Sequence, residues 1–400
     1  MKNSDRFIVI IGTFDSKGRE HQFLKEAVEK RGFKTYSINV GTGAPSTFPC
    51  DRDLFEELFR KRPQDRDLAI KKSMEKAIEI LKDLQKEQRI AGIISAGGGT
   101  GTHISTTIMS SLPVGVPKVM VSTVASKNMK EIVGTKDITM IHSVTDILGI
   151  NSILGRILDM AAGAVCGMAE PKWNPRSDKK RIALTMFGFI DSGAHKIKDC
   201  LEDMEYEVVA FHANGTGGMA MEALARDGFF DAILDLATHE LADELLKGYC
   251  SGIGPERLDP PSENPIPRLV VPGGLDCAVL EFTRKNIPSI YRDRKIFFYD
   301  FRSGIRLNED ETRAVAQWLS EKLNKAPNHT KILIPLKGWS EADREGGPLY
   351  DPKMRDIFIS TLKERLNPVI EIIEVEFHIN DDGFARLASD IMIHMMEGKR

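Results

Sequence analysis

Short apolar segments recur along the chain, and loops rich in glycine, serine or threonine follow them. In the first half these segments lie at residues 7–11, 35–40, 90–94, 118–121 and 140–141. A wholly apolar run such as residues 7–11 is typical of a strand that is buried on both faces of a parallel sheet. The longer segments between them, such as residues 20–31, have the apolar spacing of helices. The alternation therefore predicts a doubly wound parallel sheet covered by helices.

The second half of the chain repeats this pattern. Gly188, Asp191 and Ser192 reproduce the spacing of Gly12, Asp15 and Ser16, and a second Gly-Thr-Gly sequence at residues 215–217 echoes the one at residues 41–43. Between the halves, residues 171–181 are polar and contain two prolines, which is typical of a linker. We therefore predict an α/β protein with two Rossmann-like doubly wound parallel-sheet domains related by internal duplication. The expected division is an N-terminal nucleotide-binding domain at 1–170, a linker at 171–181, and a C-terminal domain with extra strands at 182–400.

Composition limits the classes of function. The chain is 42% hydrophobic and 28% charged with a net charge of −3, so nothing indicates nucleic acid as a main partner. Five cysteines without a C-x-x-C pair argue against a disulfide framework or a zinc site and favour a reducing compartment. We see neither a signal peptide nor a membrane span, and we expect a cytoplasmic protein. The helix predicted at residues 150–168 is rich in small residues, which would let it pack closely against another domain or subunit. Alternatively, it is an ordinary buried helix.

A glycine-rich loop follows the strand predicted at residues 90–94. It contains Gly97, Gly98, Gly99 and Gly101, together with Thr100 and Thr102, and a predicted helix starts there. Glycines let backbone N–H groups approach a ligand, and a helix N-terminus favours anions. The loop lacks the lysine of a Walker A motif, and threonine replaces the third glycine of the dinucleotide motif. It therefore predicts a phosphate site, with a tight turn that binds no ligand as the alternative.

Other loops of the first half carry residues that suit the same ligand. The candidates are Thr13, Asp15, Lys17, Gly41, Thr42, Ser122 and Thr123. Asp15 could hold Mg²⁺ through water or bind a ribose hydroxyl, and Lys17 could neutralise phosphate charge. Alternatively, Asp15 caps the following helix and Lys17 is solvated. The carboxyl ends of parallel strands meet at one edge of a sheet, so we favour a shared nucleotide site.

The second half offers candidates for a separate small-molecule site. They are Asp191, Ser192, Asn214, Thr216, Lys337, Ser340, Asp343 and His378. Ser340 and Asp343 could be a nucleophile and its orienting residue, but no G-x-S-x-G elbow surrounds the serine. His378 has no second histidine at the helical spacing of a metal site. We therefore assign no catalytic residue.

Several spaced motifs together resemble the ATP-binding domain family of the tomato mosaic virus resistance protein. They are Gly12-Thr-Phe-Asp-Ser-Lys17, Ser95-Ala-Gly-Gly-Gly-Thr-Gly-Thr102, Lys337-Gly-Trp-Ser340, Gly346-Gly-Pro348 and His378-Ile-Asn-Asp381. The resemblance covers nearly the whole chain and implies two Rossmann-like subdomains, ATP with Mg²⁺ on the first, and self-association into a homo-oligomer. On matching residues it implies that Thr13, Asp15, Lys17 and the loop at 97–102 contact the ATP. It supplies no reaction, because the bacterial and archaeal members are largely uncharacterised.

Three functions fit these observations. The first is an ATP-dependent enzyme that acts on a small-molecule acid in a cleft between the domains. The second is a non-catalytic nucleotide sensor or regulatory partner. The third is a hydrolase or lyase that uses the loops at residues 337–351 and 378–382 without ATP. The sequence favours nucleotide binding and leaves open whether the protein is an enzyme.

Overall fold

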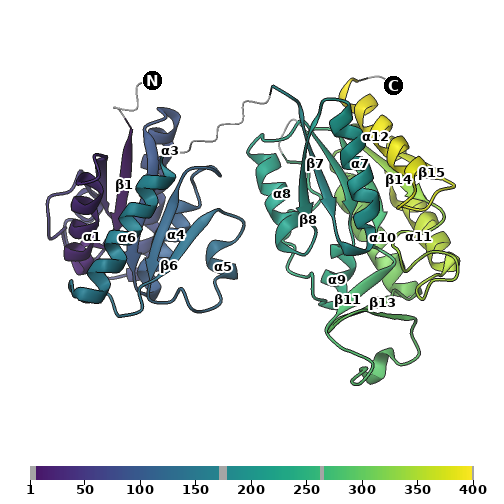
Figure 1. Cartoon of the computed structure of the whole chain (residues 1–400), viewed down its shortest axis with the longest axis horizontal. Coiled ribbons are helices and arrows are strands. Elements are labelled where there is room, and N and C mark those ends of the chain that lie inside the picture. The colour runs from purple at the N-terminus through teal and green to yellow at the C-terminus, as the bar shows by residue number, and fades with distance from the viewer. Residues whose placement is uncertain (1–5, 171–177, 262–264, 399–400) are drawn as a thin grey trace. The chain divides into compact units, whose positions relative to one another are not determined.

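The computed structural model describes residues 6–170, 178–261 and 265–398. The chain divides into two compact units, Met1–Pro175 and Arg176–Arg400, coloured purple to teal and teal to yellow in Figure 1. Each unit contains a six-stranded parallel sheet with helices on both faces, which confirms the predicted fold class. Residues 171–177 of the predicted linker lie outside the described residues, and its last residue, Arg181, begins the first strand of the second unit.

The sheet of the first unit has the order β3-β2-β1-β4-β5-β6. Its strands are β1 (Phe7–Gly12), β2 (Lys34–Asn39), β3 (Arg52–Asp53), β4 (Ile90–Gly97), β5 (Lys118–Ser122) and β6 (Ile138–His142). Its helices are α1 (Phe14–Glu29), α2 (Leu54–Leu58), α3 (Arg66–Lys86), α4 (Gly99–Met109), α5 (Lys130–Val133) and α6 (Ser152–Met168). Every strand pairs in parallel with its neighbours, so all the carboxyl ends lie at one edge.

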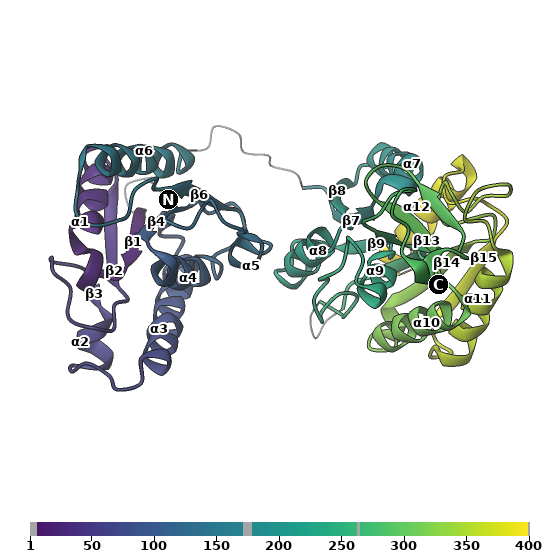
Figure 2. The same cartoon turned by 90° about the horizontal axis from the view of Figure 1, so that it is seen from below.

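Alternating side chains of β1 bury both faces of this sheet. Ile8 and Ile10 pack in a core with residues of α1 and α6, whereas Val9 and Ile11 pack in a second core with residues of α3 and α4. Figure 2 shows these two pairs of helices on opposite sides of the sheet. The apolar run that predicted a fully buried strand is therefore explained by two helical layers.

The strand order creates a switch point at β1. The chain passes from β1 to β2 on one side and, after α3, returns to β4 on the other side of β1. The loops that follow β1 and β4 therefore lead away from each other at the carboxyl edge. In open α/β sheets, diverging loops of this kind leave a crevice at the carboxyl edge, and ligands bind there.

The second unit has the sheet order β15-β14-β10-β9-β7-β8. Its parallel strands are β7 (Arg181–Met186), β8 (Glu207–His212), β9 (Ala232–Ala237), β10 (Arg268–Gly273), β14 (Thr330–Pro335) and β15 (Glu371–Val375). β7 lies between β8 and β9, just as β1 lies between β2 and β4, and this order fits the predicted duplication. A three-stranded antiparallel sheet of β11 (Cys277–Leu280), β13 (Ser303–Arg306) and β12 (Ile296–Phe298) was not predicted.

Helices cover both faces of the second sheet. α7 (Asp191–Asp203) and α12 (Asp382–Met396) share one core with it. The other face packs against α8 (Thr216–Arg226), α9 (Glu240–Leu246), α10 (Glu309–Leu323) and α11 (Pro352–Arg365). Within the described residues, no helix has the length and apolar character required to cross a membrane.

Candidate functional site

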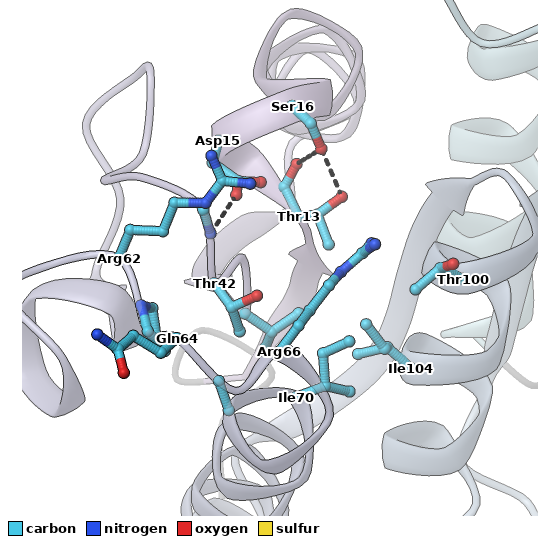
Figure 3. Close-up of a pocket in the computed structure, with 14 residues that line it drawn as sticks. Thr13, Asp15, Ser16, Thr42, Arg62, Gln64, Arg66, Ile70, Thr100 and Ile104 are labelled. Carbon is cyan, nitrogen blue, oxygen red and sulfur yellow. Dashed lines mark hydrogen bonds between the residues drawn. The ribbon is translucent and has the colours of Figure 1, made fainter.

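A pocket of about 420 Å³ opens at the carboxyl edge of the first sheet (Figure 3). Thr13 follows β1, Thr42 follows β2, and Thr100 lies in the first turn of α4; all three line the pocket. Val40, Ala69, Ile70 and Ile104 provide its apolar surface. The three predicted loops therefore meet in one pocket, while ligand binding itself stays a prediction.

Asp15 lines the same pocket and is held by the loop after β2. Its Oδ2 accepts a hydrogen bond from the backbone N–H of Gly43 at 2.9 Å. Its Oδ1 is buried and has no hydrogen-bond partner among the described residues. A Cβ atom at Gly41 would lie 2.5 Å from this carboxyl group, and one at Gly43 would lie 2.9 Å away. Glycine at these two positions therefore makes room for the Asp15 carboxylate.

The glycine-rich sequence that was predicted as a loop forms the last residue of β4, the N-cap of α4 and the first turn of α4, and it has two structural roles. A Cβ atom at Gly97 would lie 3.0 Å from the Cα of Gly101, so the tight turn itself requires Gly97. A Cβ atom at Gly99 or Gly101 would meet no atom within 4 Å. Gly98 is the N-cap of α4 and supplies no side-chain cap. Because the first amides of a helix lack intrahelical acceptors, this open end of α4 suits an anion.

Several predicted site residues have contacts within the fold. Thr102 and Ser122 are fully buried, and their hydroxyl oxygens lie 2.7 Å apart, which ties the first turn of α4 to β5. Thr123 follows β5, and its Oγ1 lies 3.8 Å from the Cβ position of Gly98. The Lys17 ammonium donates to the carbonyl oxygen of Ile147 and is not part of the pocket wall. Thr102, Ser122 and Lys17 therefore support the loops around the pocket.

His21 of α1 lies at this edge and was not predicted as a site residue. Its ring is fully buried, its Nε2 accepts from the Ala96 N–H at 3.3 Å, and its Nδ1 lies 2.7 Å from the Lys17 carbonyl oxygen. These partners require a neutral ring with the proton on Nδ1, and burial lowers the pKa of His21. His21 therefore joins α1 to the end of β4. The only sequence signal was Gly12, because a Cβ atom there would lie 2.0 Å from His21 Nε2.

Two arginines that were not predicted as site residues also line the pocket. Arg62 lies in the connection between α2 and α3, and Arg66 is the first residue of α3. Both are exposed, and neither forms a hydrogen bond or an ion pair with the residues that the structure describes. The cationic side chains of this pocket are thus arginines, where a lysine was predicted.

The candidates of the second unit do not form one site. Lys337 and His378 line a pocket of about 670 Å³ beside β14 and β15. Asp191 and Ser192 are exposed at the start of α7, and Asn214 contacts Thr216 at 3.3 Å at the start of α8. None of these last four residues lines the pocket of Lys337.

Ser340 and His378 are both engaged in internal contacts. The Ser340 hydroxyl is fully buried and donates to Asp276 Oδ2 at 2.9 Å. His378 Nε2 lies 2.9 Å from the Ser340 carbonyl oxygen, and its Nδ1 accepts from the Asn380 N–H at 3.2 Å. Both nitrogens of His378 therefore bind backbone groups, so neither is available as a general base.

Asp343 is also held inside the second unit. Its Oδ1 forms an ion pair with Arg306 at 2.8 Å, and burial raises the pKa of Asp343 to about 7. In the described parts of the chain, no group of three or more His, Cys, Asp or Glu side chains is placed to hold a metal ion. The geometry of this unit therefore indicates support of the fold by Ser340, Asp343 and His378.

Family models match both units. Residues 6–174 match the N-terminal domain of the uncharacterised protein family UPF0261, and residues 179–396 match its C-terminal domain. The chain belongs to the UPF0261 family. A UPF0261 protein of Clostridium tetani is 39% identical over 404 residues, which cover 98% of this chain and 99% of that protein. A UPF0261 protein of Mesorhizobium japonicum is 33% identical over 390 residues, 95% of this chain and 96% of that protein.

This UPF0261 chain is also similar to a plant protein. The ToMV resistance protein Tm-1(GCR237) of Solanum lycopersicum is 33% identical over 432 residues. The match covers 100% of this chain and 57% of the tomato protein. The resemblance to the family of the tomato protein is therefore confirmed.

Proposed function

We propose that this UPF0261 protein binds ATP together with Mg²⁺ in the pocket of its first unit. The observation that carries this proposal is the meeting of Thr13, Thr42 and Thr100 in one pocket beside the open end of α4. The pocket lies at the switch point of a parallel sheet, where α/β proteins bind nucleotides. Its volume of about 420 Å³ is within the usual range of small-molecule sites.

The residues of the pocket suit each part of a magnesium nucleotide. Phosphate oxygens would accept from the first amides of α4 and from the hydroxyl groups of Thr13, Thr42 and Thr100. The open space in front of Gly99 leaves room for a phosphate group to approach the backbone. Mg²⁺ bound to nucleotides commonly uses one or two protein carboxylates, and Asp15 presents an unpartnered Oδ1.

The proposed activity is binding, and no residue is assigned to catalysis. The buried hydroxyl of Ser340 and the occupied nitrogens of His378 give no support to hydrolase or lyase chemistry in the second unit. A small-molecule acid as second ligand, self-association and a cytoplasmic location also belong to the proposal. All five cysteines are free thiols, which suits a reducing compartment.

Calorimetric titration of the full chain with Mg-ATP tests the proposal. Gly99→Val places a branched side chain in front of the α4 amides, and we expect ATP affinity to fall about ten-fold or more, which is a loss of about 1.4 kcal/mol. Folding should be preserved, because the added Cβ meets no protein atom. Gly167→Val on α6 is the matched control, since its Cβ position is also open. Saturable ATP binding that Gly99→Val leaves unchanged would contradict the site, and an absence of ATP binding in the wild type would contradict the function.

A further inference from the structure

We propose that Arg62 and Arg66 bind the phosphate chain of the nucleotide and make the pocket selective for nucleoside triphosphates over monophosphates. The inference rests on the proposed nucleotide site and specifies the ligand of that site. The two arginines lie between β3 and β4, in a long charged part of the chain for which no function was predicted. The alternative is that both are ordinary solvated surface residues.

The position of Arg66 is unfavourable for the fold itself. Arg66 is the first residue of α3, where the helix dipole disfavours a positive charge. The adjacent Asp65 and Asp67 form no ion pair with it, and Asp65 Oδ1 accepts from the Leu68 N–H at 2.9 Å as the helix cap. A cation at this end of a helix that has no partner among the described residues is better explained by a ligand than by stability.

Arg62 adds a second unpaired charge to the same pocket wall. Among the described residues that line the pocket, Asp15 is the acidic one, and it forms no ion pair with Arg62 or Arg66. Two arginines against one carboxylate leave the pocket wall with an excess of positive charge. This charge would attract a bound anion.

Arg66 faces the open end of α4 across the pocket, whereas Arg62 extends toward Asp15 (Figure 3). In Figure 3 the side chain of Arg66 extends into the space between Thr13 and Thr100. An anion in this space would meet the guanidinium group of Arg66 on one side and the amides of α4 on the other, and a longer phosphate chain would extend toward Arg62. Guanidinium groups bind phosphate oxygens in pairs, so each added phosphate gives them further acceptors.

The second unit has a similar sheet, but the segments that correspond to the unpaired arginines and to the glycine-rich helix start of the first unit are different. Its segment between β8 and β9 contains α8, whose Arg226 pairs with Glu256 at 2.9 Å. After β9 the chain continues with Thr238 and His239, where the first unit has its glycine-rich sequence. The unpaired arginines and the open helix end thus occur together in the first unit.

Calorimetric titration of the full chain with ATP, ADP and AMP tests the inference. We expect Arg66→Ala to weaken ATP binding about 10- to 100-fold, the usual effect of losing charged hydrogen bonds, with AMP affinity nearly unchanged. In the double variant Arg62→Ala/Arg66→Ala, the difference between the ATP and AMP affinities should be smaller than in the wild type or in Arg66→Ala. Arg66→Lys should give an intermediate ATP affinity, because it keeps the charge and loses the paired donors.

Two further measurements exclude loss of folding as the cause. Without nucleotide, Arg66→Ala should melt at the wild-type temperature or slightly above it, because it removes a cation from a helix N-terminus. Lys72→Ala, at an exposed position of α3 outside the pocket wall, is the charge control and should leave the ATP to AMP ratio unchanged. If the double variant binds ATP and its ratio of ATP to AMP affinity equals that of the wild type, this inference is wrong and the proposed function stands. A wild type that binds none of the three nucleotides would overturn the proposed function and the inference with it.

Discussion

Arg257 and Asp235 form a two-bond ion pair inside the second unit, with both nitrogen–oxygen distances at 2.6 Å. Their side chains are 1% and 0% exposed. Arg257 also contacts Glu240 at 2.8 Å and Glu222 at 3.1 Å, and Arg268 pairs with Glu222 and Asp235. The network joins β9, β10, α8 and α9 through fully buried charges. It holds together the layer of helices on this face of the sheet.

We expect Arg257→Met to lower the free energy of unfolding of the second unit by about 3–5 kcal/mol, because it leaves three buried carboxylates short of a partner. Urea unfolding followed by tryptophan fluorescence, to which the buried Trp339 of the second unit contributes, measures this change. Arg292→Met at an exposed position is the control and should change stability by less than about 0.5 kcal/mol. A loss of under about 1 kcal/mol in Arg257→Met would show that the network contributes little.

The sequence predicted the sheets but could not predict this network. Local composition predicts the apolar strands. Parallel pairing of these strands then places Thr13, Thr42 and Thr100 at one edge of the sheet. By contrast, Arg257 lies in a segment with no periodic pattern, and its burial depends on carboxylates from three other elements. Buried ion pairs depend on tertiary contacts, which local patterns do not encode.

The candidate site shows the same division between local and tertiary information. Arg62 and Arg66 look like solvated charges in the sequence, and they become pocket residues because the start of α3 shares a pocket with the residues that follow β1 and β2. Thr102 and Ser122 have the right chemistry for a ligand, but their hydroxyl groups face each other inside the fold. The residue types therefore predicted which parts of the chain lie near the pocket. They did not predict where each side chain points, because that depends on tertiary packing.

Gly12 and His21 give a second stability prediction. We expect Gly12→Ala to destabilise the first unit by about 1–3 kcal/mol, the usual cost of overpacking, because the new Cβ would lie 2.0 Å from His21 Nε2. It should also weaken nucleotide binding, since His21 holds α1 against the end of β4. Thermal unfolding and ATP titration measure the two effects. Gly101→Ala, whose Cβ meets no atom within 4 Å, should show neither loss of folding nor a shifted melting temperature beyond about 2 °C.

Ser340 provides a test that separates support of the fold from catalysis. Ser340→Ala removes the hydrogen bond to Asp276, a buried residue whose pKa is raised by burial. We expect a loss of about 1–3 kcal/mol in the free energy of unfolding and no change in ATP affinity. Ser192→Ala, at an exposed position of α7, is the matched control. Wild-type stability in Ser340→Ala would argue against the structural role and return attention to the serine as a nucleophile.

His239 makes the second unit sensitive to acid. It is 1% exposed, its ring stacks on Phe187 with 3.9 Å between the ring centres, and neither ring nitrogen has a hydrogen-bond partner among the described residues. Burial lowers the pKa of His239 to about 3. In the unfolded chain a histidine binds a proton near pH 6.5. As the pH falls below about 6.5, the unfolded state therefore takes up the proton first, and stability present above that pH is progressively lost toward pH 3.

We expect His239→Phe to stabilise the second unit and to flatten this acid dependence. Near pH 7 the gain should be about 1–3 kcal/mol, because the variant removes buried polar atoms without partners and keeps a ring against Phe187. Between about pH 6.5 and 5 the wild type should lose about 2 kcal/mol more than the variant, since each pH unit corresponds to about 1.4 kcal/mol. Urea unfolding near pH 7 and near pH 5, followed by tryptophan fluorescence, measures both quantities. His329→Phe at an exposed position should leave the wild-type difference between the two pH values in place. Equal acid dependence in His239→Phe and the wild type would mean that His239 finds a hydrogen-bond partner in solution and titrates near its ordinary value.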